Sequence, residues 1–175
     1  RMSETRTIRV VQVGKWFHPV AGGIENHLYH LCRYLNDAVD LRVLACNDRR
    51  ATVRETFDGI DVTRLAQRAT PAGMPFFPGL IDELRRVEAD VIHVHVPNPF
   101  AELACLLVRP RAAVVSTYHH DPRPDSPMWP FYVPVSRAFL AMNARIIATA
   151  PENVRHNRLP APFRRRCRVI PLGIE

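Results

Sequence analysis

Residues 8–13, Ile8-Arg9-Val10-Val11-Gln12-Val13, form a run of mostly β-branched and apolar residues. A glycine-containing loop follows this run and ends at Gly22-Gly23. The next stretch, residues 24–35, repeats apolar side chains at the spacing of one helix face. We therefore predict a strand over 8–13, a loop, and a helix over 24–35, which is the first unit of an α/β fold.

The same alternation of short β-branched runs and longer amphipathic segments continues to the end of the chain. Further strands are predicted over residues 41–46, 60–65, 91–95, 113–117, 145–149 and 167–170, the one over 60–65 being more exposed than the others. Further helices are predicted over 78–87 and 102–108, and a third ends near Met142. The pattern predicts a doubly wound, mostly parallel sheet with helices on both faces.

The chain has 175 residues, which is the size of one domain. In sheets of this kind, ligands bind in the crevice beyond the carboxyl ends of the strands. Polar and glycine residues gather in the predicted strand-end loops, over 14–23, 96–100 and 118–125. The last predicted strand is followed almost at once by Glu175, and we expect this point to lie in an interdomain linker.

The composition is that of an ordinary globular protein, with 47% hydrophobic and 23% charged residues. The sequence contains no apolar run of 18 residues, and its first residues are polar. These features lead us to expect a cytoplasmic location. The four cysteines are scattered and form no CxxC pair, so we expect reduced thiols in the core.

The formal net charge is +7, and nearly all the basic residues are arginines. Such a surface favours phosphate groups or anionic lipid. We expect no nucleic-acid partner, because no zinc finger or RNP motif is present. The run Arg164-Arg165-Arg166 beside Phe163 is either a solvated basic face or a peripheral contact with the inner face of a membrane.

The pair Gly22-Gly23 stands directly before the first predicted helix. Backbone N–H groups at a helix N-terminus attract phosphate or carboxylate, and glycine lets such a group approach closely. The alternative is a tight turn that needs glycine for its backbone angles. Neither GxGxxG nor GxxxxGK[ST] follows the first strand, which argues against a nicotinamide dehydrogenase and a P-loop enzyme.

Histidines follow or occupy two of the predicted strands. His119 and His120 precede Asp121 at a strand end, where a histidine can act as acid or base or orient a sugar hydroxyl, or simply cap the backbone. His93 and His95 alternate along one strand and so face the same side of the sheet. We expect no metal there, because no further ligands appear at suitable spacing.

Taken in order, these segments resemble the N-terminal domain of the retaining GT-B glycosyltransferases of family 4. The resemblance rests on residues 14–19 and 22–25, on 90–95 with His95-Val96-Pro97-Asn98-Pro99, on Tyr118-His119-His120-Asp121, on 148–151, and on 167–174. It covers essentially the whole chain, and it is the order and spacing of the segments that make it specific.

The resemblance implies that the whole protein transfers a sugar from a nucleotide-sugar donor to a glycan or lipid-linked acceptor. It implies retention of configuration, no cofactor and no essential metal. It places Gly22 and Gly23 near the donor diphosphate or an acceptor group, and His119 near the transferred sugar. Residues on the acceptor side would be Lys15, Glu25, Asn98, His120 and Asp121.

This sequence departs from the family pattern at His120, where a small residue is usual, and we assign the crevice-facing position to His119. The family holds its nucleotide mainly through a C-terminal domain, so we expect residues 1–175 alone to bind donor weakly and to be inactive. One alternative function is a stand-alone carbohydrate- or phosphate-binding module. Another is a metal-dependent hydrolase that uses His93, His95 and His119.

Overall fold

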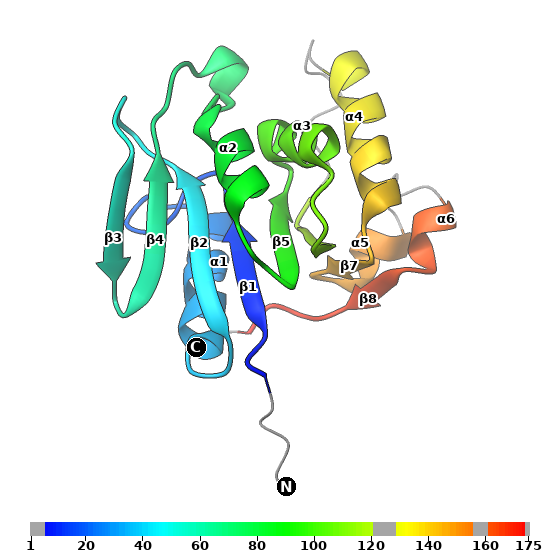
Figure 1. Cartoon of the computed structure of the whole chain (residues 1–175). Helices are drawn as coiled ribbons and strands as arrows, with labels where there is room; N and C mark the ends of the chain where they lie inside the picture. Colours follow the sequence, from blue (N-terminus) through cyan, green and yellow to red (C-terminus); the bar gives the residue numbers. More distant parts are fainter. Residues whose placement is uncertain (1–5, 121–128, 156–160, 174–175) are drawn as a thin grey trace, which may run out of the picture.

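The strands of this chain form one sheet, and their sequence order explains its topology. The computed structural model describes residues 6–120, 129–155 and 161–173, with β1 at Arg9–Val13 in the middle of the sheet (Figure 1). The other strands are β2 (Asp40–Cys46), β3 (Val53–Phe57), β4 (Ile60–Leu65), β5 (Val91–Val96), β6 (Ala113–Tyr118), β7 (Arg145–Ala148) and β8 (Cys167–Val169). Their order across the sheet is β3-β4-β2-β1-β5-β6-β7-β8.

Every neighbouring pair of strands is parallel except β3 and β4, which confirms the predicted doubly wound, mostly parallel sheet. The chain winds from β1 outward to β2 and β4, then returns to β5 and winds outward in the opposite direction. The reversal lies between β1 and β5. In open α/β sheets this switch point is where a ligand crevice forms.

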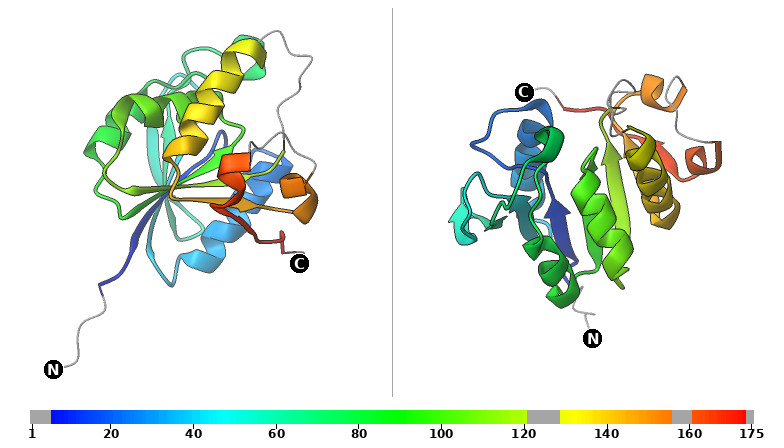
Figure 2. Two further views of the ribbon diagram at one scale, coloured as in Figure 1. Left: turned by 90° about the vertical axis from the view of Figure 1, so that its right-hand side faces the viewer. Right: turned by 90° about the horizontal axis from the view of Figure 1, so that it is seen from above.

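Helices cover both faces, because apolar side chains of the strands point to both sides of the sheet (Figure 2). Helix α1 (Gly23–Leu35) packs on one face over an apolar cluster that includes Leu28, Val43 and Val62. The other face carries a larger apolar cluster and is covered by α2 (Gly79–Arg86), α3 (Pro99–Val108) and α4 (Trp129–Met142). The remaining helices are η1 (Pro71–Gly73), α5 (Pro151–Arg155) and α6 (Ala161–Arg164).

Strand β3 was not predicted, and its presence corrects the prediction for its neighbour. It pairs with β4 through a two-residue turn at Asp58 and Gly59, which have φ of 48° and 78°. This left-handed backbone is typical of Asp-Gly hairpin turns. Because β3 takes the edge of the sheet, β4 is mostly buried rather than exposed, with Ile60 and Val62 fully buried.

Helix α3 begins at Pro99, three residues before the predicted start at Glu102. Asn98 is its N-cap: Ala101 N donates to Asn98 Oδ1 at 3.3 Å, and Asn98 N donates to the buried Glu102 carboxylate at 2.9 Å. Proline fits the first helical position because its missing N–H would be unpaired there. Cys32, Cys46 and Cys105 are buried, as predicted for thiols of the core, whereas Cys167 is only half-buried.

Gly14, at the end of β1, gives a test of backbone packing. A Cβ at this position would lie 2.5 Å from Leu28 Cδ2 and 2.7 Å from the backbone oxygen of Trp16. We expect Gly14→Ala to lower the free energy of unfolding by about 1–3 kcal/mol, because the backbone oxygen cannot move aside cheaply. Urea denaturation of the purified chain measures this loss.

Gly23 provides the matched control, because a Cβ there meets nothing within 4 Å. Gly23→Ala should change stability by less than about 1 kcal/mol, with alanine favoured in a helix. Equal losses in the two variants would contradict the packing argument for Gly14.

Candidate functional site

Polar side chains replace the apolar core at the switch point of the sheet. Alternation in β5 directs Ile92 and Val94 into the larger apolar cluster and His93 and His95 to the opposite face. On β1, Gln12 lies between Val11 and Val13 and faces the same way as the histidines. Gln12, His93 and His95 are all buried.

A chain of hydrogen bonds joins side chains of β1, β5 and the loop after β6. Gln12 Oε1 lies 3.0 Å from His95 Nε2, and His95 Nδ1 lies 3.2 Å from Nε2 of His119, the residue that follows β6. The backbone N–H of His119 donates to Val96 O at 3.2 Å, which continues the β5–β6 pairing past the strand end. The side chain and backbone of His119 are therefore both held by β5.

The chemistry of the amide sets the histidine tautomers in this chain. Gln12 Oε1 can only accept, so His95 donates from Nε2 and its Nδ1 carries a lone pair. That lone pair accepts a hydrogen bond from Nε2 of His119. The neutral His119 ring therefore keeps its Nδ1 unprotonated.

Two more histidines surround this chain. His27 on α1 places its ring 5.7 Å from the His95 ring and 5.2 Å from the His119 ring. His93 lies 4.6 Å from the His95 ring, and its Nε2 is 2.7 Å from Thr117 Oγ1. The cluster formed by His27, His93, His95 and His119 is called the histidine cluster below.

Burial keeps the histidine cluster uncharged. Desolvation, followed by the neighbouring histidines, lowers the pKa of His119 to about 3 and that of His93 to about 4. The same causes hold the pKa of His95 well below its usual value, and burial lowers that of His27. The crevice therefore presents neutral imidazole rings at neutral pH.

The histidines that could share a metal differ from the set His93, His95 and His119 that was considered from the sequence. Ligand nitrogens of His27, His95 and His119 lie within 4.8 Å of one another, the one such grouping found among the described residues. His93 is not a member, and its Nε2 is engaged with Thr117. Strand periodicity singled out His95, and a strand-end position singled out His119, but His27 was missed because it lies on a helix opposite the strands.

The structure separates the two histidines after β6. His119 is half-buried in the histidine cluster, whereas His120 is exposed. Asp121, the third predicted residue of this loop, lies outside the described residues. His119 is thus the one whose ring meets those of His95 and His27.

Gly22 and Gly23 lie at the start of the first helix, as predicted, but their surroundings differ. Gly22 is the N-cap of α1, and a Cβ on it would clash with the carboxylate of Glu25. Glu25 is buried in the first turn of α1, so its carboxylate covers the Gly22 side of this helix end. Gly23 is exposed, and a Cβ built on it would meet nothing within 4 Å.

Two other predicted residues lie in neighbouring loops. Lys15 is half-buried after β1, and its backbone oxygen accepts from Cys46 N at 3.2 Å. Asn98 is buried and caps α3, as described above. Its Nδ2 has no hydrogen-bond partner among the described residues.

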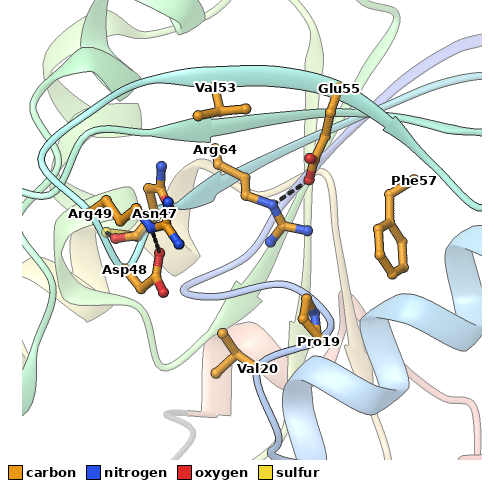
Figure 3. Close-up of a pocket in the computed structure, with 10 residues that line it drawn as sticks. Pro19, Val20, Asn47, Asp48, Arg49, Val53, Glu55, Phe57 and Arg64 are labelled. Atoms are coloured by element: carbon orange, nitrogen blue, oxygen red, sulfur yellow. Dashed lines mark hydrogen bonds and ion pairs between the residues drawn. The ribbon is translucent and has the colours of Figure 1, made fainter.

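A hollow of about 360 Å³ lies beside this crevice, at the carboxyl ends of β2 and β4 (Figure 3). It is lined by Pro19, Val20, Cys46, Asn47, Asp48, Arg49, Val53, Glu55, Phe57 and Arg64. Arg64 pairs with Glu55 at 2.6 Å and donates to the His18 backbone oxygen at 2.7 Å. Sequence reasoning missed these residues, since β3 was not predicted and Arg64 resembled a surface residue of an exposed strand.

The basic run near the end of the chain is exposed at Arg164, Arg165 and Arg166. Arg166 donates to the backbone oxygens of Ala141 and Asn143 at 2.7 and 3.2 Å, so it also holds the turn after α4. Within the described residues, no helix has both the length and the apolar composition that crossing a membrane requires.

The sheet order and the polar crevice at its switch point define a Rossmann-like domain of the GT-B type. Sucrose-phosphate synthase from Thermosynechococcus elongatus shares the fold, with a TM-score of 0.67, 15% identity, and coverage of 96% of this chain and 49% of that one. HepE from Anabaena, solved with UDP and glucose, has a TM-score of 0.63 and 15% identity, covering 96% of this chain and 45% of its own.

The chain belongs to glycosyltransferase family 4, whose model matches residues 21–175. It is 29% identical over 174 residues to O-antigen chain mannosyltransferase C of Escherichia coli, covering 96% of this chain and 46% of that protein. It is 28% identical over 157 residues to D-rhamnosyltransferase WbpZ of Pseudomonas aeruginosa, covering 88% of this chain and 41% of that protein. The chain thus spans less than half the length of these relatives.

Arg64 is expected to stabilise the loop between β1 and α1. Its side chain is 13% exposed, and removal of the guanidinium would leave Glu55 and the His18 oxygen without their partner. Arg64→Met should lower the free energy of unfolding by about 1–3 kcal/mol in urea denaturation. Arg42→Met is the control, because the Arg42–Asp61 pair is exposed, and it should cost less than about 1 kcal/mol. Similar losses would refute a special role for Arg64.

Acid is expected to destabilise the folded chain through the histidine cluster. His93 and His119 have folded pKa values of about 4 and 3, below the 6.5 of an unstructured histidine. The stabilising contribution of these histidines is therefore fully present above about pH 6.5. It falls as the pH drops towards 4, because only the unfolded chain binds these protons in that range. Each histidine should account for about 1–2 kcal/mol between pH 7.5 and 5.

Urea midpoints measured with a chelator present at the two pH values test this expectation. His119→Gln removes one of the shifted groups and should reduce the difference between pH 7.5 and 5. A variant with the same pH dependence as the wild type would show that His119 is not held neutral in the folded chain.

Proposed function

We propose that this chain is the acceptor-side domain of a glycosyltransferase that moves a sugar from a nucleotide-sugar donor to a glycan or lipid-linked acceptor with retention of configuration. The family supports transfer chemistry. The relatives named for mannosyl and rhamnosyl transfer support transfer of a sugar, and the O-antigen chain in the name of the first supports a glycan acceptor. The UDP and glucose of HepE support a nucleotide-sugar donor. The reaction is proposed for the whole protein, of which this chain would supply one side of the crevice.

The observation that carries the proposal is the His119 ring, held by His95 at the switch point with its Nδ1 free of a proton. We assign this nitrogen to accept a hydrogen bond from a hydroxyl of the transferred sugar. Glycosyl transfer passes through an oxocarbenium-like state that carries positive charge on the sugar. A neutral imidazole can orient the sugar without repelling this charge, and burial keeps the pKa of His119 at about 3.

The start of α1 is the proposed approach for the donor diphosphate. Its exposed backbone at Gly23 leaves open space, and the helix dipole favours an anion there. Glu25 covers the Gly22 side, so we assign its carboxylate to an acceptor hydroxyl rather than to phosphate. No cofactor enters this scheme, and no nucleic-acid partner is proposed.

The acceptor would lie along the loop that carries Lys15 and extend past the exposed His120. Asn98 contributes to this scheme by capping α3. For a lipid-linked acceptor, the exposed Arg164 and Arg165 would meet anionic headgroups at the inner face of a membrane. The protein would then work in the cytoplasm, at that surface.

Transfer by the full-length protein tests the proposal. GDP-mannose and UDP-glucose are donors to try with lipid-linked saccharide acceptors, and product configuration is read by NMR. His119→Ala should lower kcat/KM by about 100-fold or more, because the sugar loses a contact made at the reacting ring. Circular dichroism and thermal unfolding would verify that the variant is folded.

His120→Ala is the matched control, because His120 is adjacent in sequence but exposed. It should retain most of kcat at saturating acceptor, because a contact on the acceptor side acts on the KM for the acceptor rather than on the transferred sugar. The reverse result would move the assignment to His120, and normal turnover in both variants would refute a role for either ring. Transfer with inversion would overturn the retaining mechanism.

A further inference from the structure

His27, His95 and His119 present an unusual set of donors. They come from three different elements, α1, β5 and the loop after β6, yet one nitrogen of each lies within 4.8 Å of the other two. All three rings have a pKa lowered by burial, so each is neutral at neutral pH and has one unprotonated nitrogen. Neutral imidazole nitrogen is a good ligand for Zn²⁺, Ni²⁺ and Cu²⁺.

The spacing agrees with a tetrahedral ion. Two nitrogens bound to Zn²⁺ at about 2.0–2.1 Å in a tetrahedron are roughly 3.4 Å apart. His95 Nδ1 and His119 Nε2 are 3.2 Å apart, and His27 lies within the same small space. Three histidines and an open fourth position form a common arrangement for zinc.

The surroundings of His95 already have the form that a metal ligand needs. A histidine that binds a metal through one nitrogen usually donates its other N–H to an oxygen, which fixes the ring. His95 Nε2 donates to the buried Gln12 Oε1 and leaves Nδ1 facing His119. This bond would stay unchanged when an ion binds.

His119 needs only to change tautomer. Its proton moves from Nε2 to Nδ1, and the Nε2 lone pair then bonds to the ion, with no change in ring charge. His27 and His119 are both partly exposed, which gives an ion a path to the buried His95.

We propose that His27, His95 and His119 form a binding site for one divalent transition-metal ion, with Zn²⁺ as the favoured occupant. Binding of the ion does not depend on the proposed function. Its consequence does: if His119 contacts the transferred sugar, a bound ion removes the Nδ1 lone pair from that contact. The ion is then an inhibitor of transfer rather than a cofactor.

Zinc titration of the 175-residue chain tests the site directly. The chain is first treated with a chelator and dialysed, and then titrated with ZnCl₂ by calorimetry, with bound zinc counted by mass spectrometry. We expect one ion per chain. His27→Gln and His119→Gln should each weaken zinc affinity at least tenfold, while His30→Gln and His120→Gln, which alter histidines outside the trio, should not.

Tetrahedral Co²⁺ gives an independent reading, because its visible absorption reports the nitrogen ligands. Circular dichroism identifies any variant that has not folded, and His27 and His119 are chosen because they are less buried than His95. Zinc bound at less than one ion per chain, or affinity unchanged in both His27→Gln and His119→Gln, would overturn the site.

Assays of the full-length enzyme separate this proposal from the proposed function. Inhibition by zinc that a chelator reverses would support both. Stoichiometric binding without inhibition would keep the metal site and count against His119 as a sugar contact. A chain that binds no zinc, in an enzyme that needs His119, would refute the site alone.

Discussion

The hydrogen bond between His95 Nε2 and Gln12 Oε1 joins the two strands at which the sheet reverses direction. Both side chains are almost completely buried, and either one alone would leave a polar group unpaired at a cost of about 1–3 kcal/mol. Because Gln12 can only accept through this oxygen, it determines which nitrogen of His95 faces His119. The orientation of the crevice histidines therefore depends on a residue of the first strand.

Strand alternation explains how a core and a site share these strands. On β5, Ile92, Val94 and Val96 pack beneath α2 and α3, and the intervening His93 and His95 face α1. On the same face but farther out, over β2 and β4, the side chains return to an apolar cluster under α1. The polar patch is thus confined to the centre of the sheet, where parallel strands end together.

Much of the fold follows from local patterns. The first strand and α1 have bounds close to those predicted because their apolar spacing is regular and glycine ends the loop between them. Strand β3 was missed because Val53–Phe57 is short and polar, although the Asp58-Gly59 pair after it is a turn signal. The start of α3 was misplaced because Asn98-Pro99 was read as loop rather than as a cap and first turn.

The site could be predicted less well, because it depends on contacts distant in sequence. His119 could be placed in the crevice from its position after a strand, but nothing local distinguishes it from His120. His27 stands in an amphipathic helix, and its approach to His95 depends on how α1 lies on the sheet. Gln12, within an apolar strand, gave no signal of its own, and Arg64 was hidden by the absence of β3 from the prediction.

Two buried polar groups near the histidine cluster have no hydrogen-bond partner among the described residues, and they bear on the function of this region. Gln12 Nε2 is a buried donor with no partner among the described residues, and Asn98 Nδ2 is another. Both lie on elements that border the crevice, and unsatisfied buried groups in native proteins tend to mark functional positions. An apolar residue in place of Gln12 would remove this penalty and pack against its neighbours, but it would release His95 to rotate and to change tautomer. The stability lost at Gln12 is therefore coupled to the fixed orientation of His95 and, through it, of His119.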